Sequence, residues 1–319
     1  MIPDFPKFTE IDINSYDQIK QLVQHLPTFT EFNFVNMFVW DVVQPILVSK
    51  LNDNLIVKFI DFHNNDYYYS IMGTNLIDET IHDIFLQSDF MGRIPELHTV
   101  PHTVIEHLKN PEKYSLEEDV DNHDYILSVP EIAEYSSDKF REKRNLANRF
   151  KKKNTDHEIR ELDLSLHESV QQIDEVLVKW EGKIDKSNVD LIIEFAAIRK
   201  CLENASKLNI RCMATFVNGS VEGFTIFEHI DSRNVIMHFE KGNKHFNGIY
   251  EHQKQHLAKH LRDTGVELIN YGQDMGNIGL RQSKQSYHPV KFHKKYTIRP
   301  RSVVEHLDRS KVMVQMATA

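Results

Sequence analysis

The sequence predicts an α/β protein of two domains, each with a mixed and mostly antiparallel sheet flanked by helices (an α+β arrangement). Its 319 residues exceed the usual size of a single core. Helix-like and strand-like segments alternate along the chain, and two pairs of strand-like segments form hairpin patterns. Hydrophobic residues make up 40% of the chain and charged residues 27%, which is typical of a folded globular protein.

The first domain is predicted from a helical segment followed by paired strands. Residues 16–26 have apolar side chains at helical spacing, and residues 55–60 and 67–72 form an antiparallel strand pair. A further strand, residues 125–129, ends at Pro130. We therefore predict an N-terminal domain over 1–135, a basic connecting helix over 136–154, a C-terminal domain over 155–301 and a tail over 302–319.

The second domain has a clearer pattern. Helices are expected at 174–180 and 191–208, and strands 211–217 and 221–228 form a hairpin across Asn218-Gly219-Ser220. A strand at 234–240, a glycine-bearing loop, a helix to about residue 262 and a strand at 266–271 follow.

Several classes of protein are disfavoured by what the sequence lacks. It has no signal peptide and no run of about 18 apolar residues, so we expect a cytoplasmic protein. Cys201 and Cys212 are too few for a disulfide framework and are expected to be reduced residues in or near the core. Hydrolase, nucleotidase and dehydrogenase fingerprints do not occur.

Charge is concentrated in two basic segments. The net charge is −9, yet residues 139–153 and 278–301 each carry +7, so the rest of the chain carries −23. Such a distribution favours a specific phosphate-bearing ligand over general binding to DNA.

The first basic segment forms a helix that Ser136 or Ser137 can cap. Phe140, Ala147 and Phe150 share one stripe of this helix, and Lys143 lies within it. Either the helix is a solvated connector, or Lys143 and Arg144 form a positive wall facing a phosphate or carboxylate.

The second basic segment follows a glycine-rich turn. Glycines at 272, 276 and 279 allow sharp backbone bends, and Arg281 and Lys284 lie three residues apart on one helical face. This arrangement predicts a pocket for an anionic group.

The motifs at 140–150 and 271–289 resemble the family of phosphatidylglycerol lysyltransferase C-terminal domains. The resemblance covers about residues 34–298 and implies two acetyltransferase-like (GNAT) domains in tandem. It further implies transfer of an acyl or aminoacyl group to an amine or hydroxyl, with acyl-CoA or aminoacyl-tRNA as co-substrate and no tightly bound cofactor. The expected partners are a tRNA and a small-molecule, peptide or lipid-headgroup acceptor; no DNA partner is expected.

A donor loop is expected between the strand at 234–240 and the following helix. Gly242, Asn247 and Gly248 lie here, and a helix N-terminus offers backbone amides to an anion. The alternative is a simple connector.

Three residues around this loop are candidates for proton transfer: Glu240, Asp274 and Tyr287. The alternatives are a surface acid, a turn-forming aspartate and a packed aromatic, respectively. Gln273 stands where the family usually has an acid, which leaves open a non-catalytic module that binds an anionic ligand or partner.

A histidine stripe completes the candidates. His252, His256 and His260 recur every fourth residue, which is compatible with metal binding. Without an accompanying acid in the helix, a solvated stripe is the preferred interpretation, and no metal site is expected.

Overall fold

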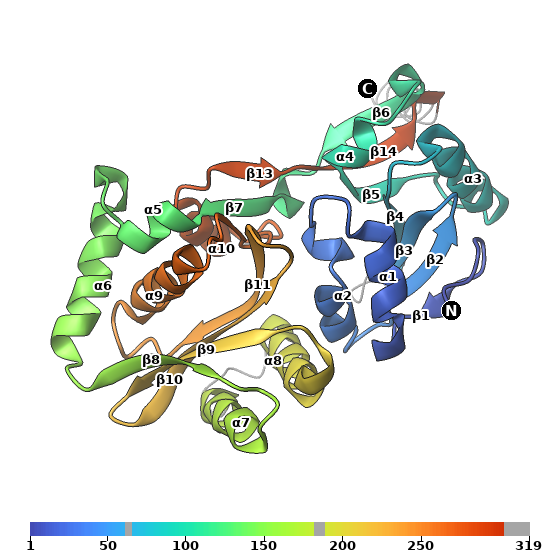
Figure 1. Ribbon diagram of the computed structural model, residues 1–319. Coiled ribbons are helices and arrows are strands. Elements are labelled where there is room, and N and C mark those ends of the chain that lie inside the picture. The colour runs from blue at the N-terminus through green and yellow to red at the C-terminus, as the bar shows by residue number, and fades with distance from the viewer. Residues whose placement is uncertain (61–65, 182–188, 303–319) are drawn as a thin grey trace, which may run out of the picture. The chain divides into compact units, whose positions relative to one another are not determined.

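The computed structural model describes residues 1–60, 66–181 and 189–302, and it confirms a mixed α/β architecture with two seven-stranded sheets (Figure 1). The chain divides into two compact units. Unit 1 comprises Met1–His123 together with the described residues from His293 onward, and unit 2 comprises Asp124–Phe292. The predicted tail, apart from Ser302, lies outside the described residues.

Unit 1 is built on a sheet in the order β1-β2-β3-β4-β5-β14-β6. All neighbouring strands in it are antiparallel except β4 and β5. Its strands are β1 (Thr9–Glu10), β2 (Leu47–Leu51), β3 (Asn54–Ile60), β4 (Tyr67–Met72), β5 (Leu97–Pro101), β6 (Tyr114–Glu118) and β14 (Lys295–Pro300). Its helices are α1 (Tyr16–Val23), α2 (Phe34–Trp40), α3 (Ile77–Phe90) and α4 (His102–Ile105).

Unit 2 is built on a sheet in the order β13-β7-β12-β11-β10-β9-β8. Its strands are β7 (Asp124–Ser128), β8 (His157–Leu162), β9 (Arg211–Val217), β10 (Ser220–His229), β11 (Asn234–Gly242), β12 (Leu268–Asn270) and β13 (Lys291–His293). Its helices are α5 (Val129–Glu134), α6 (Arg141–Lys153), α7 (His167–Glu181), α8 (Val189–Glu203), α9 (Ile249–Asp263) and α10 (Ile278–Gln285). Single 3-10 turns occur across both units at Ile13–Ser15, Thr30–Phe32, Pro111–Lys113, Val120–Asn122, Asp138–Phe140 and Ala205–Lys207.

Both units contain the same run of elements. Three antiparallel strands are followed by a helix and by a strand that pairs in parallel with the third: β2-β3-β4-α3-β5 in unit 1 and β9-β10-β11-α9-β12 in unit 2. The helix is the crossover that a parallel pair requires. The predicted fold class, two units that each carry a mixed, mostly antiparallel sheet flanked by helices, is confirmed.

The limits of the units differ from the predicted ones. β7 and α5, which the sequence assigned to the N-terminal domain, belong to unit 2, because β7 pairs with β12. Conversely, β14 lies in unit 1, where it pairs with β5 and β6. Pairing between strands this far apart in the chain leaves no local pattern in a sequence, which is why the sequence alone favoured contiguous domains.

Local signals were more dependable. The strands at 55–60 and 67–72 pair antiparallel as predicted, and so do β9 and β10. Asn218 and Gly219 both have positive φ angles (50° and 76°), as a tight two-residue hairpin turn requires. Cys201 and Cys212 are buried free thiols.

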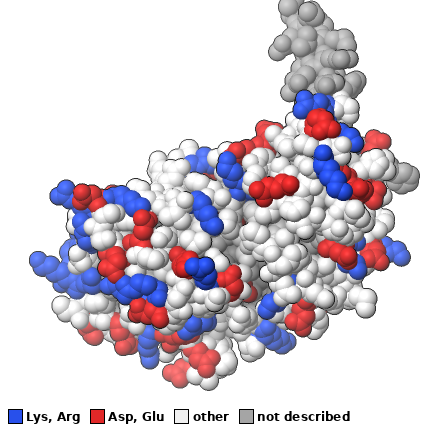
Figure 2. Space-filling model, turned by 45° about the horizontal axis from the view of Figure 1, so that its top comes forward, with Lys and Arg blue, Asp and Glu red and all other residues white. Residues whose placement is uncertain are grey.

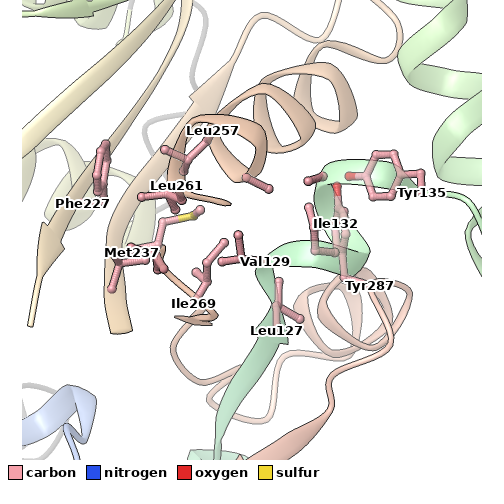
Figure 3. Close-up of a cluster of buried hydrophobic side chains, with 14 of the residues drawn as sticks. Leu127, Val129, Ile132, Tyr135, Phe227, Met237, Leu257, Leu261, Ile269 and Tyr287 are labelled. Carbon is pink, nitrogen blue, oxygen red and sulfur yellow. The ribbon is translucent and has the colours of Figure 1, made fainter. Parts of the chain in front are cut away.

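The core of unit 2 lies between α9, α5 and the sheet (Figure 3). Leu257 and Leu261 of α9 contact the same cluster as Met237 of β11 and Ile269 of β12. At one end of this cluster lie Tyr135, Phe140 and Tyr287, all at most 2% exposed. The charged side chains of Lys143 and Lys254 lie against the ring of Tyr287 at this end of the core.

Candidate functional site

The two parallel strands of unit 2 separate after three residue pairs. Asn234, Val235 and Ile236 pair with residues 268–270, after which β12 ends while β11 continues to Gly242. The last six residues of β11 therefore have no β12 partner. Side chains from α9, α10 and the segment after β12 meet this part of β11.

A bulge in β11 turns Glu240 toward α9. Ile226 and Phe227 are consecutive in β10 but pair with Phe239 and Met237, which leaves His238 as the extra residue. The bulge shifts the alternation of side chains by one position. Met237 and Glu240, three residues apart, consequently both face α9, where Met237 contacts the apolar core and Glu240 contacts Lys254.

Glu240 and Lys254 form a buried ion pair. The side chain of Lys254 is 0% exposed and that of Glu240 is 7% exposed. Oε2 of Glu240 accepts hydrogen bonds from Lys254 and, at 3.0 Å, from the hydroxyl of Tyr271. Oε1 of Glu240 is equally buried and has no hydrogen-bond partner within the described part of the chain. An unpartnered carboxylate oxygen costs free energy, so this atom is a candidate to receive a substrate group.

Aromatic rings surround the lysine ammonium. Nζ of Lys254 lies 4.0 Å from the ring centroid of Tyr271 and 4.8 Å from that of Tyr287. The two rings contact each other edge to face, with centroids 5.9 Å apart. Burial lowers the pKa of Lys254, against the opposing attraction of Glu240. The rings stabilise the ammonium through their π faces.

Lys284 adds a second titratable amine to this group. It donates a hydrogen bond to the backbone carbonyl of Tyr271, and its Nζ lies 4.3 Å from the centroid of that ring. Burial, with a smaller contribution from the nearby Lys254, lowers the pKa of Lys284 to about 7. An amine with this pKa can both accept and release a proton near neutral pH.

Lys143 approaches from α6. Its Nζ lies 4.2 Å from the centroid of Tyr287 and 3.3 Å from a carboxylate oxygen of Glu251. The prediction that Lys143 faces inward from the apolar stripe of this helix is confirmed, since its side chain is only 12% exposed. We refer below to the lysine–tyrosine centre, which consists of Lys143, Glu240, Lys254, Tyr271, Lys284 and Tyr287.

Asp274 lies in a turn rather than in this centre. Its side chain is fully buried, and it accepts hydrogen bonds from Arg281 Nε (2.9 Å) and Nη2 (2.8 Å), from the Tyr125 hydroxyl (2.5 Å) and from the Gly276 amide (2.9 Å). Burial opposes ionisation, but the hydrogen bonds from Arg281 and Tyr125 outweigh it and lower the pKa of Asp274. Asp274 is the turn-forming aspartate of the alternative interpretation, and its oxygens are occupied.

The two arginines expected to bind an anion are occupied as well. Arg281 is held in the bidentate pair with Asp274. Arg144 donates to the backbone carbonyls of Tyr135, Ser136 and Ser137, which follow α5. The basic segments do converge, but through Lys143 and Lys284 instead of the arginines, because the lysines occupy the buried faces of their helices.

The glycine loop packs against α6. Gly248 has a φ of 91°, and a Cβ built on it would lie 2.1 Å from the backbone oxygen of Leu146. Its missing side chain therefore makes room for α6, not for a ligand. A Cβ on Gly242 would lie 2.9 Å from Ile249, and Asn247 is exposed to solvent.

Tyr287 is the predicted proton donor whose surroundings are most apolar. It is 2% exposed and lies in the aromatic end of the unit 2 core, close to Ile132 (Figure 3). Burial raises the pKa of Tyr287 well above its usual range. A phenol with a raised pKa is a poor proton donor. The apolar surroundings of Tyr287 therefore favour the alternative role, a packed aromatic side chain.

Lys254 and Tyr271 were absent from the predicted set, although one of them leaves a signal in the sequence. Lys254 precedes Leu257, Ala258 and Leu261 at spacings of three, four and seven residues, so it lies on the apolar stripe of α9. The same argument identified Lys143. Tyr271 follows a short strand, and its local sequence does not distinguish a functional tyrosine from one that only packs in the core.

One member of the histidine stripe of α9, His252, is buried rather than solvated, while His256 and His260 are half-buried. His252 is 7% exposed and stacks on Phe150 with centroids 4.8 Å apart, and His157 lies against it at 4.9 Å. Burial lowers the pKa of His252 to about 3. Over the described ranges, no group of three or more His, Cys, Asp or Glu residues could hold a metal ion.

The outer face of α6 is strongly basic. Figure 2 shows Lys and Arg side chains gathered along the edge of unit 2 that α6 forms. Arg141, Arg149, Lys152 and Lys153 are exposed, and the described residues supply none of them with an ion pair. No described helix combines the length and apolar character needed to cross a bilayer.

Comparisons with known proteins agree with this fold. The family model "Phosphatidylglycerol lysyltransferase, C-terminal" matches residues 24–299. Among solved structures, a conserved protein of unknown function from Bacteroides thetaiotaomicron has a TM-score of 0.77 at 23% identity, covering 93% of this chain and 99% of that one. L-PGS from Bacillus licheniformis has a TM-score of 0.61 at 12% identity, covering 100% and 99%. No curated protein sequence matches the chain.

Proposed function

We propose that this chain, which belongs to the family of phosphatidylglycerol lysyltransferase C-terminal domains, is an acyl- or aminoacyltransferase with its reactive groups in unit 2. The donor is an aminoacyl-tRNA or an acyl-CoA, and the acceptor is an amine or a hydroxyl. One observation carries the proposal: Oε1 of Glu240 is buried without a partner on the part of β11 that has separated from β12.

Glu240 is assigned the role of general base. Its Oε1 removes a proton from the attacking amine or hydroxyl as the new bond to the acyl carbon forms. The tetrahedral intermediate then collapses, and the bond from carbon to the ribose oxygen or the coenzyme sulfur breaks. Lys284, whose pKa is about 7, is assigned the role of general acid: it donates a proton to the leaving oxygen or sulfur. Lys254 and Tyr271 fix the other oxygen of Glu240 and so orient the base.

Glu240→Gln tests this role. The substitution keeps the shape of the side chain and removes its basicity, so we expect turnover to fall by about 10²–10⁴. The assay measures single-turnover transfer of labelled lysine from lysyl-tRNA, and in parallel of acetyl from acetyl-CoA, to phosphatidylglycerol micelles and to small amines. Unchanged turnover with the donor that wild type uses would remove Glu240 from the mechanism.

Unit 1 offers a matched control. Glu31 and Lys295 form a second buried ion pair, with side chains 8% and 0% exposed. Glu31→Gln makes the same change in charge and shape at a comparable depth. It should reduce stability but leave turnover per folded molecule near wild type, and an equal loss in both variants would indicate that the effect of Glu240→Gln comes from unfolding.

The basic face of α6 separates the two donor classes. A tRNA presents many phosphates, and each neutralised phosphate contributes to a steep dependence of affinity on salt. The exposed cations at Lys152 and Lys153 suit such a backbone. Lys152→Glu combined with Lys153→Glu should weaken lysyl-tRNA binding by at least about tenfold and leave acetyl-CoA binding unchanged. Equal tRNA affinity in variant and wild type would favour acyl-CoA as donor.

A non-catalytic module is the second candidate. It is favoured by the hydrogen bonds that occupy both carboxylate oxygens of Asp274, one of the predicted proton-transfer residues. It predicts binding of lysyl-tRNA or acetyl-CoA with no transfer to either acceptor class. Native mass spectrometry of the purified protein, combined with the transfer assay above, distinguishes binding from turnover.

A further inference from the structure

A row of histidines lies where α9 meets the strands β8, β9 and β10 of unit 2. His252 of α9 lies against His157 of β8, with ring centroids 4.9 Å apart. Further along the helix, Nε2 of His260 lies 3.3 Å from Nη2 of Arg211 in β9. Nη1 of the same guanidinium lies 3.2 Å from Nε2 of His229 in β10. The contacts of this row do not include the lysine–tyrosine centre, which lies on a different side of α9.

The guanidinium of Arg211 dictates the protonation of two of these rings. An arginine donates hydrogen bonds and cannot accept them, so each Nε2 that faces Arg211 must be an acceptor. His229 and His260 therefore make this contact only as neutral rings with their proton on Nδ1. Glu161 of β8 is already bound by Arg211 through both oxygens, at 2.6 and 2.5 Å. A proton on either Nε2 would place an N–H against the N–H of Arg211 and one cation beside another.

His252 is held neutral by burial. Its side chain stacks on Phe150, and its Nδ1 is buried without a hydrogen-bond partner in the described part of the chain. If this ring were protonated, Nδ1 would be a buried donor without an acceptor, which costs free energy. Burial, helped by the neighbouring bases, accounts for the pKa of about 3.

Bases dominate the surroundings of the row. The groups that act on His252 and His256 are His157 of β8, Lys151 of α6 and Lys259 and His260 of α9. Burial, together with these neighbours, lowers the pKa of His256 as well. Burial also lowers the pKa of His229, where Arg211 and His260 outweigh the opposing charge of Glu161. Other acids in contact with side chains of α9 are paired with cations: Glu134 with Arg262, Glu240 with Lys254 and Glu251 with Lys143.

We propose that this row is a pH-sensitive latch: neutral histidines hold α9 on β8, β9 and β10, and mild acid releases the helix by protonating them. An ordinary histidine has a pKa of 6.5, and the latched rings at 229, 252 and 256 lie below it. The released helix therefore binds protons that the docked helix excludes. Docking is fully favourable above about pH 6.5 and is lost progressively as the pH falls toward the lowered values.

Release of α9 would also disassemble the lysine–tyrosine centre. Lys254 belongs to α9 and pairs with Glu240 of β11, so the two separate when the helix leaves the sheet. The latch itself does not depend on which group unit 2 transfers. Its readout can therefore be structural, and a failure of the latch would leave the proposed reaction untouched.

Hydrogen exchange followed by mass spectrometry tests the latch on the full chain. His252→Phe keeps an aromatic ring on Phe150 and removes the titrating group. Wild type and variant are compared at the same pH, so the intrinsic dependence of exchange on pH cancels from the ratio of their rates. From about pH 7.5 to about pH 5.5, the ratio of wild type to variant in α9 peptides should rise about tenfold, because the released histidine is then roughly nine-tenths protonated. In α3 peptides of unit 1 the ratio should stay constant.

Two further variants make the result specific. His229→Gln keeps an oxygen that can accept from Arg211 but cannot titrate, and it should give a rise of at least about threefold. His167→Gln, at an exposed histidine of α7, is the control and should give none. A ratio independent of pH in both His252→Phe and His229→Gln would overturn the proposal. So would an equal rise in His167→Gln or in the α3 peptides.

Discussion

The helices α3 and α9 occupy the same place in the element order of their units, but only α9 buries a charged side chain. α3 packs Ile77, Ile81 and Ile84, each at most 2% exposed, against the strands of unit 1. α9 places a fully buried Lys254 against Glu240 at the corresponding strand of unit 2. Since α3 packs on its sheet without burying a charged side chain, a helix at this place in the fold does not require the charges that unit 2 buries. Buried charges that the fold does not require are characteristic of functional sites.

The largest expected effect comes from separating the charges of unit 2. Lys254→Met leaves Glu240 buried without its cation and should lower the free energy of unfolding by about 3–5 kcal/mol. Glu240→Gln combined with Lys254→Met removes both charges and should recover most of this loss. Transfer activity should remain absent in the double variant, because the base is gone.

Tryptophan fluorescence can report this result for unit 2 alone. The chain has two tryptophans, Trp40 in unit 1 and Trp180 in unit 2. The ring of Trp180 stacks on Phe224 of β10, with centroids 6.2 Å apart. Urea unfolding in a Trp40→Phe background therefore follows unit 2. If the double variant were as unstable as Lys254→Met, the charges would be structural, and the contrast between the two helices would lose its functional meaning.

The second prediction concerns the start of α9. Gly248→Ala places a Cβ against the backbone of Leu146 in a left-handed conformation. Strain of about 1–2 kcal/mol and overpacking of about 1–3 kcal/mol should add. Gly265→Ala is the matched control, since Gly265 has a similar φ of 87° but nothing within 4 Å of the new Cβ. It should cost only the strain. Thermal and urea unfolding of both variants measure the difference. Equal losses of unfolding free energy would mean that α6 shifts at little cost to make room for the new Cβ.

The third prediction follows from the pKa of Lys284. In the folded chain this pKa is about 7, below the ordinary lysine value of 10.5. Between these pH values the unfolded chain binds a proton that the folded chain does not, so folding is increasingly favoured as the pH rises. Wild type should gain about 2 kcal/mol of stability between pH 7 and 9 relative to Lys284→Met, with exposed Lys291→Met as the control. A constant difference across this range would contradict the lowered pKa.

The sequence predicted the two domains, most elements and the segments that form the centre, because periodicity and turn residues are local properties. It also placed Lys143 on a buried stripe. It did not foresee the partners of Arg144 and Arg281, since motif residues look alike until their partners are known: Arg281 binds Asp274 seven residues away, and Arg144 binds carbonyls of the preceding turn. The bulge at His238, which turns Glu240 inward, depends on the pairing of β10 with β11 and could not be read from either strand alone.

The smallest effect is expected from Tyr287→Phe. The sequence offered two roles for Tyr287, a general acid or a packed aromatic, and the raised pKa and buried ring favour packing. Removing the hydroxyl alone should therefore change single-turnover rate by less than about threefold, whereas a positioned acid is worth about 10²–10⁴. Tyr287→Ala, which removes the ring from between Lys143, Lys254 and Tyr271, should cost about 3–5 kcal/mol of stability. A hundredfold slower Tyr287→Phe at unchanged melting temperature would restore Tyr287 as the acid and displace Lys284 from that role.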